Sequence, residues 1–482
     1  MTTSVFKEHG MKNYIEIKTQ EIQALYKSDN RPWVIGYSGG KDSTTTLQLI
    51  FSAMIDLIEK EGPKALHKNI YVITSDTLVE NPLIIDFITS NINSINAAAE
   101  SYRLPLTAYS CKASYEESFW TLLIGKGYPS PRQKFRWCTH RLKIKPIDRF
   151  IEEKIQEHEE VIVVLGVRSQ ESSSRKQTIE SHRINDRLLK KHATLNNAFT
   201  YTPIESFSTD DVWGYLLHNK NPWGANNTEL FGLYKDSQDS TECPMQLDEN
   251  TPSCGNSRFG CWTCTVVQKD KSLTGFLNNG YYELEPLLEF RDYLMDIRNN
   301  PDYRQSHRMN GSIYYTKNAD GTRKQGLGPF NLFARTEILK KLLTAQEKAK
   351  EIAKDLEHDT KLELITEEEL HLIRMHWMES GDWDDTLPEL YQKIMQKKFN
   401  IQENEREIFQ KNDRARLSQI CKKYNVDLEI IKQLIQLESK NANLKRRRNI
   451  ITEIEQLLHK DWIHEDIVES LEDLKDGYDY EN

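Results

Sequence analysis

Apolar and polar positions alternate with two different periods along the first half of the chain. Short apolar runs, which are typical of buried strands, occupy residues 33–37, 70–74, 104–109 and 161–167. Helical spacing fills the intervals, and it is clearest after the first run, where the apolar positions are Leu47, Ile50, Phe51, Met54, Ile55 and Ile58. Strands that alternate with helices predict an α/β fold, with a mainly parallel sheet and helices on both of its faces.

The pattern changes twice further along the chain. From residue 221 to about residue 280, Asn, Pro, Gly, Trp and Cys are frequent and periodicity is weak. From about residue 335 onward Lys, Glu, Leu and Ile recur at helical spacing, with runs at 417–437 and 450–458. We therefore expect three segments: an α/β domain at 1–220, a cysteine-rich segment and connection at 221–334, and a charged helical region at 335–482.

The composition argues against two classes of protein. No apolar stretch is long enough to span a membrane or to act as a signal peptide, so we expect a cytoplasmic protein with no membrane partner. The seven cysteines are an odd number, which argues against a disulfide framework in that compartment. The 482 residues carry a formal net charge of -9, and this acidic total still permits a local basic surface.

The most informative segment joins the first predicted strand to the helix that follows it. Its residues are Ser38, Gly39, Gly40, Lys41, Asp42 and Ser43. The glycines let backbone N–H groups converge on an anion, the helix N-terminus adds its dipole, and the lysine and hydroxyls add donors. This combination predicts a pyrophosphate site, and a glycine turn capped by Asp42 or Ser43 is the alternative. The Walker pattern of P-loop NTPases is absent.

Two further segments follow predicted strands. Asp76 comes after the second strand, within Ser-Asp-Thr, and Gly166 and Arg168 come after the fourth. Because the carboxyl ends of parallel strands meet at one edge of a sheet, these residues and the glycine-rich loop are expected to line one crevice. Arg168 and Arg175 have guanidinium groups that suit phosphate oxygens. The sequence therefore predicts one nucleotide site built from three strand ends.

Four cysteines fall within 22 residues, in the order Cys243, Cys254, Cys261 and Cys264. The Cys-x-x-Cys turn places two sulfurs together, and the two upstream thiolates complete a four-sulfur site. Zinc and a 4Fe-4S cluster both satisfy this ligand count, and the irregular intervals favour the cluster. Unliganded buried cysteines and a redox pair at Cys261 and Cys264 are the alternatives.

A basic segment surrounds Cys138. Its cations predict an anion-binding surface, a candidate DNA contact and a lowered pKa for the Cys138 thiol; they are Lys134, Arg136, Arg141, Lys143 and Lys145. A solvated basic helix start with a buried cysteine is the alternative. A second basic run lies at 445–448, and there a solvated face is the preferred interpretation.

These motifs together resemble a known superfamily. Ser-Gly-Gly-Lys-Asp-Ser at 38–43 resembles the PP-loop of the ATP pyrophosphatases, which cleave ATP between the α and β phosphates and adenylate an acceptor. The segments 138–146 and 166–175 resemble the phosphoadenylylsulfate reductase-like branch of that superfamily. The stretch 253–265, followed by the long helical extension, resembles the DndC family of DNA phosphorothioation sulfurtransferases.

The resemblance implies an enzyme that uses ATP, Mg²⁺ and a 4Fe-4S cluster to replace a non-bridging oxygen of a DNA phosphate by sulfur. The catalytic residues that it implies are Lys41, Asp42, Cys138 and Arg168. The nucleotide contacts that it implies are Ser38, Gly39, Gly40, Lys41, Asp42, Ser43, Asp76, Gly166, Arg168 and Arg175, with Mg²⁺ at Asp42 or Asp76. The implied partners are DNA, a cysteine desulfurase as sulfur source and other subunits of the phosphorothioation machinery.

The cluster ligands are expected to be Cys243, Cys254, Cys261 and Cys264. In cluster-carrying reductases of the superfamily a ligand lies at the motif that Cys138 matches, so Cys138 is an alternative ligand. In its other role Cys138 would carry the sulfur as a persulfide.

Three other functions are compatible with these motifs. A tRNA thiolation enzyme of the PP-loop class would combine the same loop and cluster. A sulfonucleotide reductase shares the fold, but the sequence ends in Asp-Gly-Tyr-Asp-Tyr-Glu-Asn, without the cysteine expected of that class. An assembly subunit would use ATP binding only as a switch. The intact loop at 38–43 favours an enzyme that uses ATP.

Overall fold

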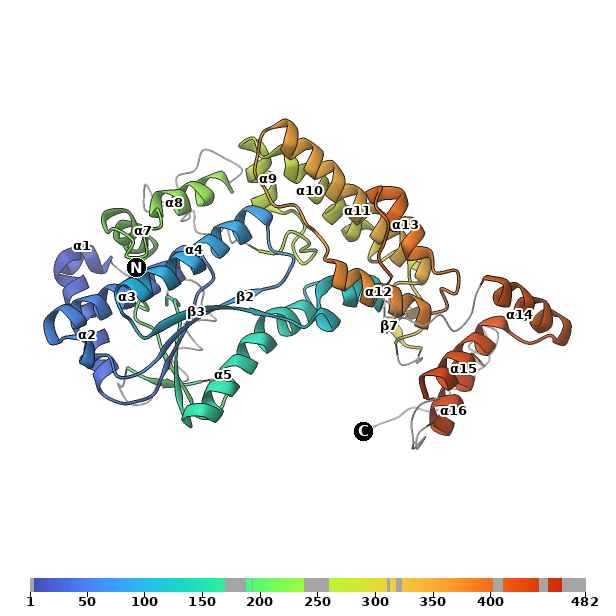
Figure 1. Ribbon diagram of the computed structural model, residues 1–482, viewed down its shortest axis with the longest axis horizontal. Coiled ribbons are helices and arrows are strands. Elements are labelled where there is room, and N and C mark those ends of the chain that lie inside the picture. The colour runs from blue at the N-terminus through green and yellow to red at the C-terminus, as the bar shows by residue number, and fades with distance from the viewer. Residues whose placement is uncertain are drawn as a thin grey trace. The chain divides into compact units, whose positions relative to one another are not determined.

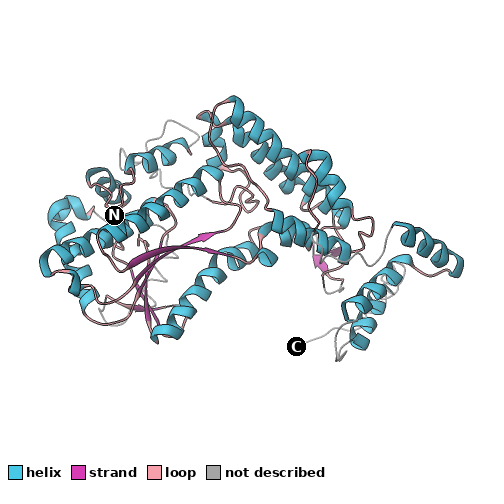
Figure 2. Cartoon of the chain, viewed as in Figure 1, coloured by secondary structure: helices cyan, strands magenta, loops and turns pink. Residues whose placement is uncertain are grey.

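A computed structural model of the chain describes residues 4–169, 188–192, 194–237, 260–309, 313–317, 323–401, 411–441 and 450–461 (Figures 1 and 2). Two compact units share these residues. Unit 1 comprises Met1–Phe119, Pro131–Arg291 and Lys348–Leu364, and unit 2 comprises Trp120–Ser130, Asp292–Glu347 and Ile365–Asn482. Each unit is assembled from separate stretches of sequence, and the division at 1–220, 221–334 and 335–482 stays a prediction.

Unit 1 is built on a six-stranded sheet in the order β3-β2-β1-β4-β6-β5. Its strands are β1 Trp33–Gly36, β2 Ile70–Asp76, β3 Leu106–Lys112, β4 Val161–Val164, β5 Lys190–Lys191 and β6 Ala198–Tyr201. Every neighbouring pair is parallel except β5 with β6, and Trp33 of β1 pairs with Ile70 on one side and Ile162 on the other. The predicted α/β fold and its four strands are confirmed, while β5 and β6 have no counterpart among the predicted strands.

Helices cover both faces of this sheet (Figure 2). The helices of unit 1 are α1 Val5–His9, α2 Met11–Lys27, α3 Lys41–Glu61, α4 Pro82–Ser101, α5 Lys145–His158, α7 Thr209–His218, α8 Asn227–Asp236 and α9 Lys271–Asn278, with short helical turns at Pro63–Ala65, Tyr115–Glu117, Thr139–Ile144 and Tyr282–Leu284. Successive strand residues point to opposite faces. Trp33 and Ile35 therefore lie in one core with α2, α3 and α4, whereas Val34 lies in a second core with α5.

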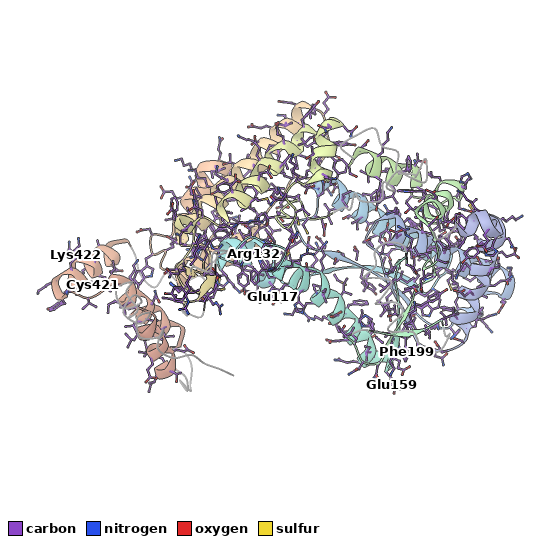
Figure 3. The ribbon with its side chains drawn as sticks, turned by 180° about the vertical axis from the view of Figure 1, so that it is seen from behind. Glu117, Arg132, Glu159, Phe199, Cys421 and Lys422 are labelled. Carbon is purple, nitrogen blue, oxygen red and sulfur yellow. The ribbon has the colours of Figure 1, made fainter. Side chains whose placement is uncertain are left out.

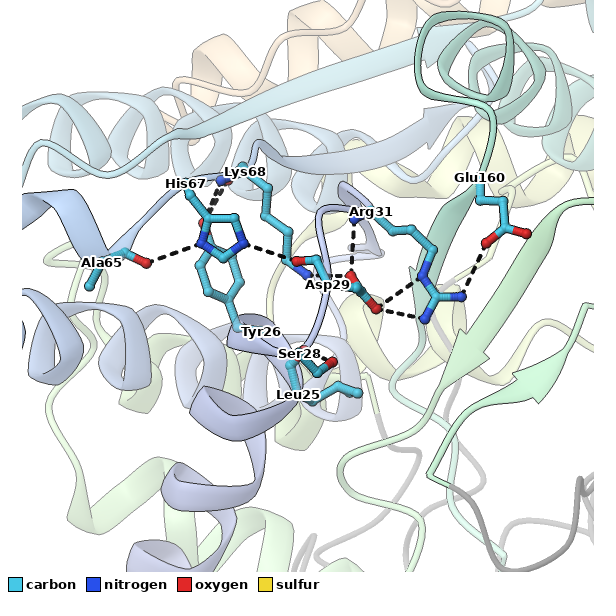
Figure 4. A network of polar contacts seen from close by, with 9 residues as sticks. All are labelled: Leu25, Tyr26, Ser28, Asp29, Arg31, Ala65, His67, Lys68 and Glu160. Carbon is cyan, nitrogen blue, oxygen red and sulfur yellow. Dashed lines mark hydrogen bonds and ion pairs between the residues drawn. The ribbon is translucent and has the colours of Figure 1, made fainter.

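A network of ion pairs lies next to the amino ends of β1 and β2 (Figure 4). The ammonium of Lys68 lies 2.8 Å from the Asp29 carboxylate, and the Arg31 guanidinium lies 2.6 Å from the same carboxylate. Lys68 is 5% exposed, and its ammonium also lies 4.9 Å from the centre of the Tyr26 ring. Asp29 therefore supplies the counter-charge for a buried lysine.

Unit 2 is mainly helical in its described part. Its elements include α12 Glu367–Glu379, α13 Thr386–Met395, α14 Lys411–Tyr424, α15 Leu428–Asn441, α16 Ile450–Asp461, the helical turns Thr121–Gly125 and Pro301–Tyr303, and a two-stranded ribbon of β7 Tyr315–Lys317 and β8 Arg323–Gln325. Helices α10 Glu285–Ile297 and α11 Leu332–Asp355 contribute residues to both units. The predicted helical character of the C-terminal region is confirmed for its described residues.

One predicted helix is split in two. The run 417–437 breaks between α14 and α15, where Asn425 has a φ of 54°. Asparagine tolerates this left-handed conformation better than most residues, and a helix commonly ends at such a position. Within the described ranges, no helix has the length and apolar character needed to cross a bilayer.

Candidate active site

The strand order creates a switch point at β1. The chain runs from β1 outward through β2 to β3, and it returns to β4 on the other side of β1. Loops that leave neighbouring strands in opposite directions open a crevice at the carboxyl edge of the sheet, where ligands of such folds bind. The glycine-rich loop follows β1, Asp76 ends β2, and Arg168 follows β4, so the three predicted segments meet this edge from adjacent strands.

The loop between β1 and α3 has the shape of an anion cradle. Gly39 has a φ of +71°, and a Cβ there would lie 2.5 Å from the Ile88 side chain, so only glycine fits. Gly40 is the extended residue that precedes α3. The Ser43 hydroxyl donates to the Gly40 carbonyl at 3.0 Å and accepts from the Ser38 N–H at 3.2 Å. These bonds hold the loop around the N-terminus of α3, whose free N–H groups attract an anion.

A chain of charges joins the start of α3 to the end of β4. The Asp42 carboxylate lies 3.3 Å from the Lys41 ammonium, and it accepts a hydrogen bond from Arg168 Nε at 2.6 Å. Arg168 is 3% exposed and also donates to the Thr209 hydroxyl at 3.2 Å. One carboxylate shared by two cations leaves a net positive charge beside the cradle, which favours phosphate.

Gly166 allows the loop after β4 to contact the first turn of α3. A Cβ at Gly166 would lie 2.7 Å from the backbone oxygen of Asp42 and 2.9 Å from the backbone nitrogen of Ser43. Those atoms belong to the first turn of α3 and cannot rotate away. Gly166 is therefore required because the loop after β4 passes directly against the cradle.

Tyr234 of α8 is a site residue that the sequence motifs did not reveal. Its hydroxyl accepts the backbone N–H of Lys41 at 3.3 Å, and the Lys41 ammonium lies 5.1 Å from the centre of its ring. A lone tyrosine in an amphipathic helix carries no motif that sequence reasoning could have used. Thr209, which contacts Arg168, was likewise not predicted as a site residue.

Asp76 has protein partners in the structure. Its carboxylate accepts the Leu78 N–H at 2.8 Å and lies 3.0 Å from the Lys112 ammonium. The Lys112 side chain is about half exposed, so this pair is weak and exchangeable. No described contact joins Asp76 to Asp42, and a shared role for them at Mg²⁺ stays a prediction.

The loop after β2 also holds the Cys-x-x-Cys turn. Glu80 and Cys261 form an isolated antiparallel bridge, and the Trp262 N–H donates to the Val79 carbonyl at 3.1 Å. The Thr77 hydroxyl lies 3.4 Å from the Cys261 sulfur. The sequence did not single out Glu80 as a site residue, and it gave Thr77 only as a neighbour of Asp76.

Cys138 shares this neighbourhood, although 123 positions of sequence separate it from Cys261. Burial raises the pKa of the Cys138 thiol, and the charge of Cys264 raises it further. Burial and the Glu80 carboxylate raise the pKa of Cys261 to about 12, and Cys138 adds to that effect. The predicted lowering of the Cys138 pKa is therefore wrong, because burial and neighbouring sulfur outweigh the hydrogen bonds that lower it.

Lys143 interacts with Glu80 and with two of these sulfurs. Its ammonium lies 3.1 Å from the Glu80 carboxylate. Burial lowers the pKa of Lys143, but the negative charges of Cys261, Glu80 and Cys138 outweigh burial and raise it above the ordinary lysine value. The Lys143 ammonium thus interacts with two sulfurs and one carboxylate, and Cys138 also interacts with Cys264.

Other predicted site residues lie outside the described residues. They are Cys243, Cys254, Arg175 and the basic run 445–448. Within the described residues, no group of three or more His, Cys, Asp or Glu side chains converges closely enough to hold a metal ion. The described thiols of Cys138, Cys261 and Cys264 nevertheless have the donor chemistry that an iron-sulfur cluster needs.

The basic segment around Cys138 divides into paired and unpaired cations. Arg141 and Lys145 both contact the Glu117 carboxylate, at 3.0 and 2.6 Å, and Glu117 is labelled in Figure 3. Lys143 contacts Glu80, as described above. Three of the five cations expected to bind an anion are therefore engaged within the protein.

Comparisons with known proteins identify two segments of the chain. Residues 32–267 match the phosphoadenosine phosphosulfate reductase domain, and this range includes every predicted site residue. Residues 412–460, which cover most of α14, α15 and α16, match a small protein found in certain Dnd DNA modification systems. About half of the chain is thus similar to a phosphoadenosine phosphosulfate reductase domain, and a C-terminal segment is similar to a small protein of Dnd systems.

Individual relatives are more distant. An uncharacterized protein of Methanocaldococcus jannaschii is 29% identical over 224 residues, which are 46% of this chain and 38% of that protein. An FMN adenylyltransferase of Candida glabrata, solved with FAD and inorganic pyrophosphate, has a TM-score of 0.29 at 15% identity, covering 50% of this chain and 69% of that one. The U34-tRNA thiolase NcsA of Methanococcus maripaludis, solved with its 4Fe-4S cluster, has a TM-score of 0.28 at 13% identity, covering 59% and 81%.

Proposed function

We propose that this chain is the sulfurtransferase of a DNA phosphorothioation system, of the DndC type. It activates a DNA phosphate with ATP and replaces a non-bridging oxygen by sulfur. The observation that carries the proposal is that the phosphate cradle follows β1, while the loop after the adjacent strand β2 bridges to Cys261, which interacts electrostatically with Cys138. The Dnd-type segment at 412–460 supports DNA as the acceptor.

The first step is adenylation. A non-bridging oxygen of the DNA phosphate attacks the α-phosphorus of ATP, and the bond to the β-phosphate oxygen breaks. Lys41 and the N–H groups at the start of α3 hold the departing pyrophosphate, and their charge is in place before the reaction begins. Arg168 holds the Asp42 carboxylate away from the cradle. In this position the Asp42 carboxylate remains paired with the Lys41 ammonium.

Asp76 supplies a carboxylate for Mg²⁺ at the nucleotide. Carboxylate oxygens are the ligands that Mg²⁺ takes together with substrate phosphates. The exposed Lys112 that now pairs with Asp76 is a weak competitor. Asp42 is less suited to this role, because two cations already share its carboxylate.

The second step replaces AMP by sulfur. A sulfur nucleophile attacks the activated DNA phosphorus, and AMP leaves with the oxygen that had attacked ATP. We assign Cys138, Cys261 and Cys264 to the iron-sulfur site, with the fourth ligand from Cys243 or Cys254. When bound, the cluster supplies iron that can hold the transferable sulfur. Lys143 offsets the negative charge that thiolate ligands bring to the site.

A reconstitution experiment tests the proposal. The chain is prepared anaerobically and combined with ATP, Mg²⁺, a cysteine desulfurase, the other subunits and duplex DNA. Pyrophosphate release and phosphorothioate linkages in digested DNA are then measured. We expect DNA to stimulate pyrophosphate release, and we expect Lys41→Ala to abolish both products while the exposed control Lys64→Ala retains them.

The alternatives give different results. Stimulation by tRNA and not by DNA would identify a tRNA thiolation enzyme. Normal phosphorothioation by Lys41→Ala would identify an assembly subunit. Protein that contains zinc and no iron would contradict the cluster.

A further inference from the structure

A small basic hairpin immediately precedes Cys138. The Arg132 N–H donates to the Phe135 carbonyl at 3.1 Å, and the Phe135 N–H donates to the Arg132 carbonyl at 2.8 Å. These two bonds close a turn with Gln133 and Lys134 at its tip. We call residues 131–136 the basic hairpin, and its Arg132 is labelled in Figure 3.

The basic hairpin carries three cations that are free to contact a partner. Arg132, Lys134 and Arg136 are exposed, and none of them forms an ion pair within the part of the chain that the structure describes. They differ in this from the three neighbouring cations that pair with Glu117 and Glu80. The surrounding sequence is also strongly basic. Residues 118–147 contain seven lysines and arginines and no acidic residue, although the whole chain has a net charge of -9.

An exposed aromatic ring accompanies these charges. Phe135 is 40% exposed. Residues directly opposite each other in a hairpin project to the same face, so Arg132 and Phe135 share one face. Cations next to an exposed ring are the combination with which proteins hold single-stranded nucleic acid, because the ring stacks on a base and the cations contact phosphates.

Both ends of the hairpin are fixed beside the sulfur site. The Thr265 hydroxyl, next to Cys264, donates to the Pro131 carbonyl at 2.6 Å. At the other end Trp137 is buried and stacks on Phe119, with ring centres 5.4 Å apart and an interplanar angle of 21°. Cys138 follows directly. Phe135 is three residues from Cys138, which is at most about 10 Å of chain.

We propose that the basic hairpin binds the DNA strand next to the phosphate that is modified. Phe135 stacks on an unstacked base, and Arg132, Lys134 and Arg136 contact flanking phosphates. The inference rests on the proposed function, because it takes DNA as the acceptor. It adds that the strand is opened locally at the site, since the Phe135 ring can stack only on a base that has left the duplex stack.

Salt titration of DNA binding tests the hairpin. The full chain is titrated with labelled single-stranded DNA at several KCl concentrations. Each phosphate contact on a single strand contributes about 0.7 to the slope of log K against log salt. We expect the triple variant Arg132→Gln, Lys134→Gln, Arg136→Gln to reduce the magnitude of this slope by about 2. The control triple Lys7→Gln, Lys12→Gln, Lys64→Gln changes the net charge equally and is expected to leave the slope within error.

The aromatic contribution is tested separately. Phe135→Ala is expected to weaken binding about 5- to 150-fold, which corresponds to one stacked base, with an unchanged salt slope. Phe135→Trp keeps a stacking surface and is expected to retain affinity. The melting temperature and the ATP affinity of each variant show that the fold and the nucleotide site are intact.

The outcomes separate this inference from the proposed function. If native protein binds DNA and DNA stimulates its pyrophosphate release, but the hairpin variants keep native affinity and slope, the hairpin assignment is wrong and the function stands. The assignment also fails if the native chain binds no single-stranded DNA. If native protein responds to tRNA and not to DNA, the proposed function is wrong, and the DNA contact is withdrawn with it.

Discussion

The hydroxyl of Tyr234 accepts a hydrogen bond from the backbone N–H of Lys41, with an O···N distance of 3.3 Å. That N–H belongs to the first turn of α3, where a bound phosphate would find its donors. The ring of Tyr234 meanwhile lies 5.1 Å from the Lys41 ammonium. The tyrosine therefore competes with phosphate through its hydroxyl and supports Lys41 through its ring.

Tyr234→Phe is expected to tighten ATP binding. The variant removes the competing acceptor and keeps the ring beside Lys41. One neutral hydrogen bond contributes about 0.5–1.5 kcal/mol, so the Kd for ATP should fall about 2- to 10-fold. Isothermal titration calorimetry measures this, and Tyr234→Leu, which removes the ring as well, serves as the comparison. A weaker Kd for Tyr234→Phe would show that the hydroxyl assists the bound nucleotide.

Gly166→Ala is expected to damage the site and the fold together. The added Cβ would meet the Asp42 backbone oxygen at 2.7 Å, so α3 or the loop after β4 must move. We expect a loss of about 1–3 kcal/mol in the free energy of unfolding and a weaker Kd for ATP.

Gly232→Ala is the matched control for this substitution. Gly232 lies within α8, and a Cβ there meets no atom within 4 Å. Alanine also has a higher helix propensity, so the control is expected to be neutral or stabilising by up to about 1 kcal/mol. Chemical denaturation measures both variants. Native stability and ATP affinity for Gly166→Ala would contradict the close approach of the two segments.

Cys138→Ser is expected to lower the iron content of the anaerobically prepared protein. The electrostatic coupling of Cys138 to Cys261 and Cys264 supports it as a cluster ligand. Cys111→Ser is the control, because Cys111 lies on β3, where burial and the charge of Glu153 raise its pKa to about 11. Iron and sulfide analysis and the visible absorbance measure the result.

The same analysis identifies the fourth ligand. Of Cys243→Ser and Cys254→Ser, the variant that loses iron marks the ligand. An intact cluster in Cys138→Ser would leave Cys243, Cys254, Cys261 and Cys264 as the set and would free Cys138 to carry a persulfide.

Asp29→Asn is expected to destabilise unit 1 at neutral pH by about 3 kcal/mol, because it leaves the buried Lys68 without a counter-charge. Burial raises the pKa of Asp29, but hydrogen bonds from Arg31 and Lys68 outweigh burial and hold it below its ordinary value of 3.8. This carboxylate therefore stabilises the fold above pH 3.8, and the stabilisation is lost as the pH falls through the folded-state pKa. The acid limb of the stability curve should accordingly be shallower in Asp29→Asn.

Lys68 makes a separate contribution to the pH dependence of stability, at alkaline pH. Burial lowers its pKa despite the opposing effect of Asp29. Without Asp29 the pKa should fall further, so the variant should regain stability as the pH rises toward the ordinary lysine value. Asp56→Asn, which alters a surface helical pair with Lys60, is the control and should cost no more than about 0.5 kcal/mol. Equal losses in both variants would contradict a specific role for the buried pair.

The sequence by itself determined the features that depend on neighbouring residues. Strand and helix periods predicted the strands β1 to β4 and the helices between them, because burial of one face imposes a period on the chain. Ser38 to Ser43 predicted an anion cradle, because converging N–H groups and a helix N-terminus are local properties of six residues. The Cys-x-x-Cys turn at Cys261 and Cys264 predicted a sulfur site for the same reason.

Only the tertiary structure decided which distant segments meet. Arg168 lies 126 positions from Asp42, and Tyr234 lies 193 positions from Lys41, so no local pattern could have paired them. The pKa of Cys138 was predicted with the wrong sign because adjacent cations are visible in the sequence, whereas burial and the approach of Cys264 are not. Which cations of the basic segment form ion pairs was likewise decided only by the fold. The fold brings Glu117 and Glu80 to three of these cations and leaves Arg132, Lys134 and Arg136 exposed to water. The reason is that Coulomb attraction depends on distance in space and not on distance along the chain.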